Sequence, residues 1–376
     1  MTRQWDPAAV DEASDPDAAA AFAAAFDRLG GTLAIEKRGD EPGRDLFREL
    51  RWHMREMIRM GREVPPPQLT TGDIYLDFVD NATFNAAAIK LDGHELIGIY
   101  SGAIFLIYNY FSSFLSDPSV LPQIGNPSVE TKDEETLAAL RDRHLSDIAP
   151  RRPLDPTRNL AASRFAWGAT CLLFLHEARH HMAGHLEFMR DEFALRDYIE
   201  LPALPLSPEE CAIRRALEFD ADLGAAGTHM RWWLDAWGTN RIPELEALPP
   251  ALSWCICVAM LYKIMDAEQM DRPFQLATHP PAIARWLYTA FTANQANYIG
   301  VSIRLDDAFF EAGQSEVVRW WNENKLPVPK SANLSSVRSA IEHVRSTYDD
   351  HGKIMPRVRR FAEHRASEIR NRYSNP

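Results

Sequence analysis

His176, Glu177 and His180 have the types and the spacing that suit metal chemistry. They form the pattern HExxH within an apolar run that favours a helix, and residues four apart on a helix lie on the same face. Both imidazoles would therefore reach one metal ion, with Glu177 beside it as a general base for water. His181 and His185 follow closely, and we expect them at the surface or hydrogen-bonded to a ligand.

A catalytic zinc ion needs a third protein ligand and an open position. His185 would supply the ligand in the longer pattern HExxHxxGxxH, but Ala183 stands in the place of the glycine and the register fails. Glu187 is a second candidate without a supporting partner. Glu218 is the better candidate because Asp222 follows it by one helical turn, where it would accept the ring N–H of a ligand histidine.

The elements that must position these residues are mostly helices. Helical patterns cover 15–29, 44–60, 102–115, 133–145, 159–184, 208–227, 251–270 and 280–292. The helix at 159–184 carries the HExxH motif. Short β-prone runs cover 74–79, 83–89 and 94–100. Asp92-Gly93 between the last two runs is typical of a hairpin. We therefore predict an α+β fold that is mainly helical, with a small antiparallel sheet.

Composition narrows the class of protein. The 376 residues are 46% hydrophobic and 25% charged, as in an ordinary globular chain. The net charge of −12 argues against sequence-independent binding of nucleic acid. Four unevenly spaced cysteines and an N-terminal segment without an apolar run predict a cytoplasmic protein. The uncharged stretch 96–115 has the length of a membrane span, but Asn109, glycines and serines interrupt it, so we expect buried core.

Further motifs give the chain a resemblance to a known group. HExxH followed by a distant ExxAD at 218–222 resembles the gluzincin zinc peptidases, specifically those similar to HtpX and the CAAX prenyl protease. The run 278–285 has the THPPxxxR form of that group, and 84–88 with 99–102 are similar to its NAfA strand and the turn after it. The resemblance covers about 74–285. A second similarity is to phage-exclusion proteases of the Lit type, which also carry HExxH.

The resemblance implies a zincin fold of the gluzincin type and a Zn²⁺ cofactor held by the two motif histidines and Glu218. It places His279 and Arg285 near the metal as candidate donors to a developing oxyanion. Arg285 has an equal claim to a structural role, in which it orients Glu218 or Asp222 through a charge-assisted hydrogen bond. The implied substrate strand, to which an extended peptide would add as a further strand, consists of Asn85, Ala86, Ala87 and Ala88.

We therefore expect a soluble zinc-dependent endopeptidase that hydrolyses a peptide bond in a cytoplasmic protein, with a role in stress or phage defence. Its metallopeptidase domain would span 71–300, between helical extensions at 1–70 and 301–376. The alternative is a catalytically silent zincin-fold protein that binds or senses a metal or a peptide. Glu177 argues against that alternative, because metal binding does not require it. A third interpretation is a helical structural protein in which the motif is a coincidence.

Overall fold

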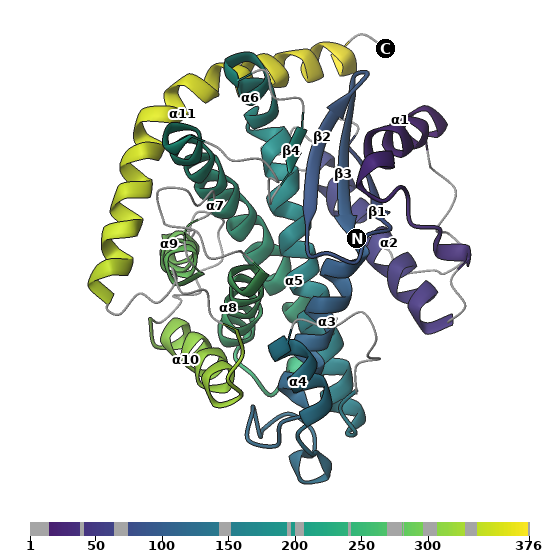
Figure 1. The fold of residues 1–376 in the computed structure, drawn as a ribbon, viewed down its shortest axis with the longest axis vertical. Helices are drawn as coiled ribbons and strands as arrows, with labels where there is room; N and C mark the ends of the chain where they lie inside the picture. Colours follow the sequence, from purple (N-terminus) through teal and green to yellow (C-terminus); the bar gives the residue numbers. More distant parts are fainter. Residues whose placement is uncertain are drawn as a thin grey trace. The chain divides into compact units, whose positions relative to one another are not determined.

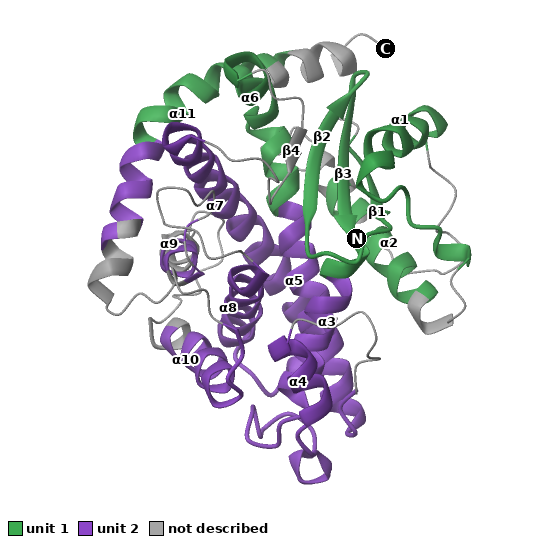
Figure 2. Cartoon of the chain, viewed as in Figure 1, with its two compact units in different colours: residues 1–103, 176–203, 352–376 green, residues 104–175, 204–351 purple. Residues whose placement is uncertain are grey.

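The structure is a computed structural model in which the chain forms two compact units (Figure 2). Unit 1 comprises 1–103, 176–203 and 352–376, and unit 2 comprises 104–175 and 204–351. The structure describes residues 15–37, 41–63, 74–142, 152–193, 197–199, 207–239, 242–268, 280, 282–295, 307–327 and 337–374. The division into a central domain and two extensions stays a prediction.

The described strands form a four-stranded sheet in unit 1. They are β1 Ile74–Val79, β2 Ala86–Leu91, β3 His94–Tyr100 and β4 Asp197–Ile199. Their order is β1-β3-β2-β4; β3 runs parallel to β1 and antiparallel to β2, and β4 runs antiparallel to β2. The sheet is therefore mixed, and the prediction of an antiparallel sheet is wrong for the pair β1 and β3.

Two local features account for the mixed sheet. Asp92-Gly93, with φ of 50° and 86°, forms the predicted hairpin between β2 and β3. The connection over 80–85 then passes the end of β3, where the Gly102 N–H donates to the Asn81 carbonyl. A Cβ at Gly102 would lie 2.1 Å from the Ala82 carbonyl oxygen, so this crossing requires glycine. Because the connection crosses the end of β3, that strand lies between β1 and β2.

Helix α1, Pro16–Phe26, covers one face of the sheet (Figure 1). Asp15 is its N-cap, and the side chain accepts hydrogen bonds from the next turn. Phe22 and Phe26 pack on residues of three strands, among them Val79, Ala87, Leu96 and Tyr100. The other helices that lie wholly in unit 1 by their described bounds are α2 Glu41–Glu63 and α6 His185–Phe193.

The described part of unit 2 is helical. The other α-helices that the structure describes, which lie wholly or partly in unit 2, are α3 Ser101–Leu115, α4 Glu134–Asp142, α5 Pro156–Met182, α7 Pro208–Gly238, α8 Pro250–Glu268, α9 Ala282–Gln295, α10 Asp307–Glu323 and α11 Val337–Ser374. Helix α7 continues past Gly227, where the sequence suggested its end. Burial of Trp232 and Trp233 beyond that glycine outweighs the roughly 1 kcal/mol that a glycine costs inside a helix.

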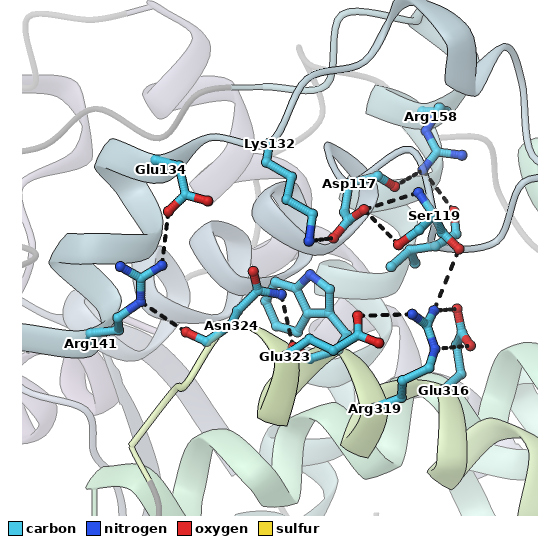
Figure 3. Close-up of polar contacts among 12 residues, drawn as sticks. Asp117, Ser119, Lys132, Glu134, Arg141, Arg158, Glu316, Arg319, Glu323 and Asn324 are labelled. Atoms are coloured by element: carbon cyan, nitrogen blue, oxygen red, sulfur yellow. Dashed lines mark hydrogen bonds and ion pairs between the residues drawn. The ribbon is translucent and has the colours of Figure 1, made fainter.

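A buried arginine organises the segment between α3 and α4 (Figure 3). Arg158 of α5 donates hydrogen bonds to the main-chain carbonyls of Leu115, Asp117, Val120, Leu121 and Ile124. The Asp117 carboxylate pairs with Lys132 at 2.9 Å. Figure 3 also shows Arg141 of α4, which donates to the main-chain carbonyl of Asn324. The buried Arg158 side chain therefore fixes the segment between α3 and α4 through its main-chain carbonyls.

Among the described residues, one helix has the length and apolar composition needed to cross a membrane. It is α8, and 83% of its apolar window is buried inside the protein. The stretch 96–115, which the sequence singled out for its lack of charge, divides instead into the end of β3 and all of α3. Most residues of both elements are buried, which agrees with the prediction of core.

Candidate metal site

Two helices supply the ligands of a candidate metal site. Helix α5 carries His176 and His180 one turn apart, and α7 carries Glu218. One ligand atom from each of these residues lies within 4.8 Å of the others. The side chains are buried, with exposed fractions of 3%, 0% and 1%. The structure therefore brings together the three residues that the sequence suggested as ligands.

Aromatic packing joins α5 to α7 within unit 2. The Trp167 ring of α5 lies on the Trp232 ring of α7, with centroids 4.3 Å apart. A Cβ at Gly168 would lie 2.3 Å from Trp233, so the glycine permits this close approach. From this contact the motif histidines lie further along α5, and Glu218 lies a similar distance back along α7.

The donor set fits a zinc ion. Catalytic zinc sites commonly use two imidazole nitrogens and one carboxylate oxygen, and they keep a fourth position open. Zinc binds nitrogen at about 2.0–2.1 Å, so two nitrogens on a tetrahedral ion are about 3.3 Å apart. The Nε2 atoms of His176 and His180 are 3.2 Å apart. Both rings therefore direct Nε2 towards one point, as binding of a single ion requires.

Glu177 is buried beside the histidines. It follows His176 on α5 and has no exposed surface. Its negative charge acts on Tyr100, the last residue of β3: burial and, to a smaller extent, Glu177 raise the pKa of Tyr100 to about 12. A carboxylate in such surroundings interacts strongly with nearby charges, because the local dielectric constant is low. The position suits proton transfer at a metal.

Asp222 lies one turn after Glu218 on α7. Its carboxylate accepts hydrogen bonds from Arg285 Nε at 2.7 Å, from Arg285 Nη2 at 2.6 Å and from the Tyr288 hydroxyl at 2.6 Å. Burial disfavours the guanidinium charge, but Asp222 outweighs that effect and the pKa of Arg285 is raised well above its usual value. Both of these donors belong to α9. The sequence analysis had instead expected a ligand histidine to donate to Asp222.

The contacts of Arg285 are those of a residue that orients a partner. Besides Asp222, its guanidinium lies over the Tyr262 ring, with the central carbon 4.7 Å from the centroid. Of the two roles that the sequence left open, the structural one agrees with these contacts, and a catalytic one stays a prediction. His279, the other candidate donor to an oxyanion, lies outside the described residues.

The expected substrate strand coincides largely with β2, which contains Ala86, Ala87 and Ala88 and follows Asn85. β2 is an internal strand: β3 pairs with one side and β4 with the other, where Ala87 lies opposite Ile199 and Ala88 opposite Tyr198. The expectation of an open edge is therefore wrong along these residues. The strand that covers the edge comes from more than a hundred positions later in the chain, a distance over which local β-propensity carries no information.

One residue of the site has a role that the sequence reasoning missed, and another has one of the two roles that the sequence suggested. His185 Nδ1 lies 2.9 Å from Nδ1 of the candidate ligand His180. Tyr288 donates to Asp222. A signal for Tyr288 was present, because it follows Arg285 by three residues on a helix and so shares its face. For His185 the sequence suggested either the surface or a hydrogen bond to a ligand, and its contact with His180 agrees with the second of these.

Comparisons with protein-family models, with curated proteins and with solved structures find no match to this chain. Functional conclusions therefore rest on the residues of the site.

Proposed function

We propose that this protein is a zinc-dependent endopeptidase of the gluzincin type, which hydrolyses a peptide bond in a protein substrate. The proposal is carried by the buried group of His176, His180 and Glu218, whose ligand atoms lie within 4.8 Å, with Glu177 beside it on the same helix. A metal receptor needs the three ligands alone, whereas hydrolysis also needs a base. The expected cytoplasmic location and a role in stress or phage defence rest on the sequence.

A zinc ion in this site would lower the pKa of a water ligand to about 7 and polarise a substrate carbonyl. His176, His180 and Glu218 would hold the ion and leave one position for the reactants. Glu177 would take a proton from the attacking water and pass it to the leaving amine. Its complete burial strengthens these charge interactions, because little bulk water screens them.

The substrate in this proposal is an extended peptide segment that adds to β2. Along Ala87 and Ala88 the pairing groups of β2 are occupied by β4. A peptide would therefore have to displace β4 from these residues. Because it would bind through main-chain hydrogen bonds, its binding would have little sequence selectivity.

The pairing of β4 with β2 is also the observation that favours a second function. If β4 stays in place, a peptide cannot pair with β2 along these residues, and the site would serve as a metal receptor without turnover. In that case the three ligands would bind zinc, and Glu177 would have no proton to transfer. The two functions agree on metal binding and differ on Glu177.

The experiment compares the peptide fragments that cells accumulate with the wild type and with Glu177→Gln. The substitution keeps the shape of the side chain and removes the base. For the peptidase we expect zinc at one equivalent in both proteins and a loss of cleavage in the variant. Glu209→Gln is the matched control, because it makes the same change at an exposed position in the first turn of α7.

The outcomes separate the functions. Fragments that disappear with Glu177→Gln and persist with Glu209→Gln support the peptidase and identify its substrate. Stoichiometric zinc with identical fragments in all three proteins supports the metal receptor instead. Absence of stoichiometric zinc from the wild type would contradict both functions.

A further inference from the structure

His180 has a hydrogen-bonding partner that is itself a histidine. The Nδ1 atoms of His180 and His185 are 2.9 Å apart, and the ring centroids are 5.0 Å apart at an interplanar angle of 66°. Both side chains have no exposed surface. At this distance one nitrogen carries the proton and the other accepts it.

The direction of this hydrogen bond follows from the other ring nitrogen of His180. His180 Nε2 lies 3.2 Å from His176 Nε2, on the side where the ligand atoms gather. A nitrogen that binds a metal presents its lone pair, so the proton of a neutral His180 belongs on Nδ1. His185 Nδ1 is then the acceptor, and His185 carries its own proton on Nε2.

A glycine turn brings His185 to this position. Helix α5 ends at Met182, and Gly184 adopts a φ of +74°, a conformation that side chains rarely allow. A Cβ at Gly184 would also lie 2.7 Å from the main-chain nitrogen of Ala362. The turn starts a new helix, α6, at His185 itself. His185 therefore approaches His180 from a separate helix, which the spacing within α5 could not indicate.

Contacts with β2 and with α11 fix the position of helix α6. Glu187, two residues after His185, accepts a hydrogen bond from Lys90 of β2 at 2.6 Å. The Phe188 ring lies 6.1 Å from the Phe361 ring of α11. These contacts hold the first turn of α6, so His185 meets His180 with a defined geometry.

We propose that His185 is a positioning residue for the metal site: it accepts the Nδ1 proton of His180 and thereby fixes the tautomer and the ring plane that present Nε2 to the ion. The proposal rests on the metal site of the proposed function and extends it, since an imidazole takes the place in which a carboxylate was expected. His185 does not itself bind the metal.

The test compares His185→Leu with His185→Asn. Leucine fills the space and removes the acceptor, whereas the asparagine carbonyl oxygen restores an acceptor near the former Nδ1. Zinc affinity is measured by competition with a chelator, and folding is checked by circular dichroism and thermal unfolding. We expect His185→Leu to bind zinc about 10–100-fold more weakly, the range typical of residues that orient metal ligands, and His185→Asn to recover most of that loss.

A second readout needs no metal. Nitrogen-15 NMR of histidine-labelled, metal-free protein reports which ring nitrogen of His180 carries the proton. We expect the Nδ1–H form in the wild type and in His185→Asn, and a shift towards Nε2–H in His185→Leu. Unchanged zinc affinity and an unchanged tautomer in a folded His185→Leu would overturn the proposal. If the wild type binds no zinc, the proposed function fails, and the tautomer measurement still decides the role of His185.

Discussion

Arg285 binds Asp222 through two parallel hydrogen bonds, from Nε to Oδ2 at 2.7 Å and from Nη2 to Oδ1 at 2.6 Å. Both side chains are almost fully buried, and the Tyr288 hydroxyl donates a third hydrogen bond to the same carboxylate. Asp222 lies one turn from Glu218 on α7, so this cluster fixes the part of the helix that carries the candidate carboxylate ligand. The pair is a strong constraint because neither charge has access to bulk water.

Arg285→Met is expected to lower the free energy of unfolding by about 3–5 kcal/mol, because Asp222 stays buried without its cation. The double variant Arg285→Met/Asp222→Leu should recover much of that loss, since it removes both charges. Urea unfolding of the wild type, both single variants and the double variant measures the coupling. Additive losses in the double variant would show that the two residues do not act as a pair.

Removal of the metal is expected to destabilise the protein. A ligand at about 100 times its dissociation constant adds about 2.7 kcal/mol of stability, which a chelator should abolish. Glu218→Gln removes a charged ligand, so its zinc affinity should fall by more than about 100-fold, beyond the loss typical of residues that only orient ligands. Thermal unfolding with zinc and with chelator measures both effects. Glu209→Gln should respond to zinc as the wild type does, and an equal response of Glu218→Gln would contradict the assignment of the ligand.

Gly168→Ala is expected to cost about 1–3 kcal/mol of stability and to weaken zinc binding, because the new methyl group meets Trp233 at 2.3 Å and separates α5 from α7. Gly227→Ala is the matched control on α7, where a Cβ has nothing within 4 Å. That control should stabilise the protein by about 0.5–1 kcal/mol, the usual gain from alanine in a helix. Chemical unfolding and zinc titration of both variants test the contrast, and a similar effect of the two changes would contradict it.

His229 is expected to make the protein less stable in acid. Burial lowers its pKa from 6.5 to about 3, with the Gly168 backbone acting in the opposite direction, and Trp254 Nε1 donates to its Nδ1 at 3.1 Å. Because the folded pKa is below the unfolded one, the unfolded chain binds more protons between these values. The stability from neutral His229 is complete above pH 6.5 and is lost as the pH falls towards about 3.

The slope for one proton is about 1.4 kcal/mol per pH unit. In His229→Gln, whose side-chain oxygen can still accept from Trp254, the dependence of stability on pH over this range should be weaker by about that slope. Unfolding midpoints from pH 4 to pH 7 measure it. Equal slopes in the two proteins would mean that His229 is not buried as a neutral ring.

Much of the local structure is visible in the sequence. The helical pattern from residue 15 marked the start of α1, Asp92-Gly93 marked the hairpin, and HExxH placed two histidines on one face of α5. Each of these depends on neighbours within a few residues, through capping, turn geometry or helical periodicity. Glu218 was also found from the sequence, because its spacing to Asp222 suggested a functional helix face.

The tertiary structure decided which distant groups meet. It placed β1 parallel to β3, paired β4 with β2, and brought the Arg285 guanidinium into hydrogen-bonding contact with the Asp222 carboxylate. It also turned the chain at Gly184 so that His185 reaches His180. Such contacts depend on packing between elements that are far apart in the chain, and on sites such as Gly102 and Gly168 where a missing side chain permits close approach. The sequence by itself identified the candidate ligands and the candidate base, and only the fold determined which groups surround them.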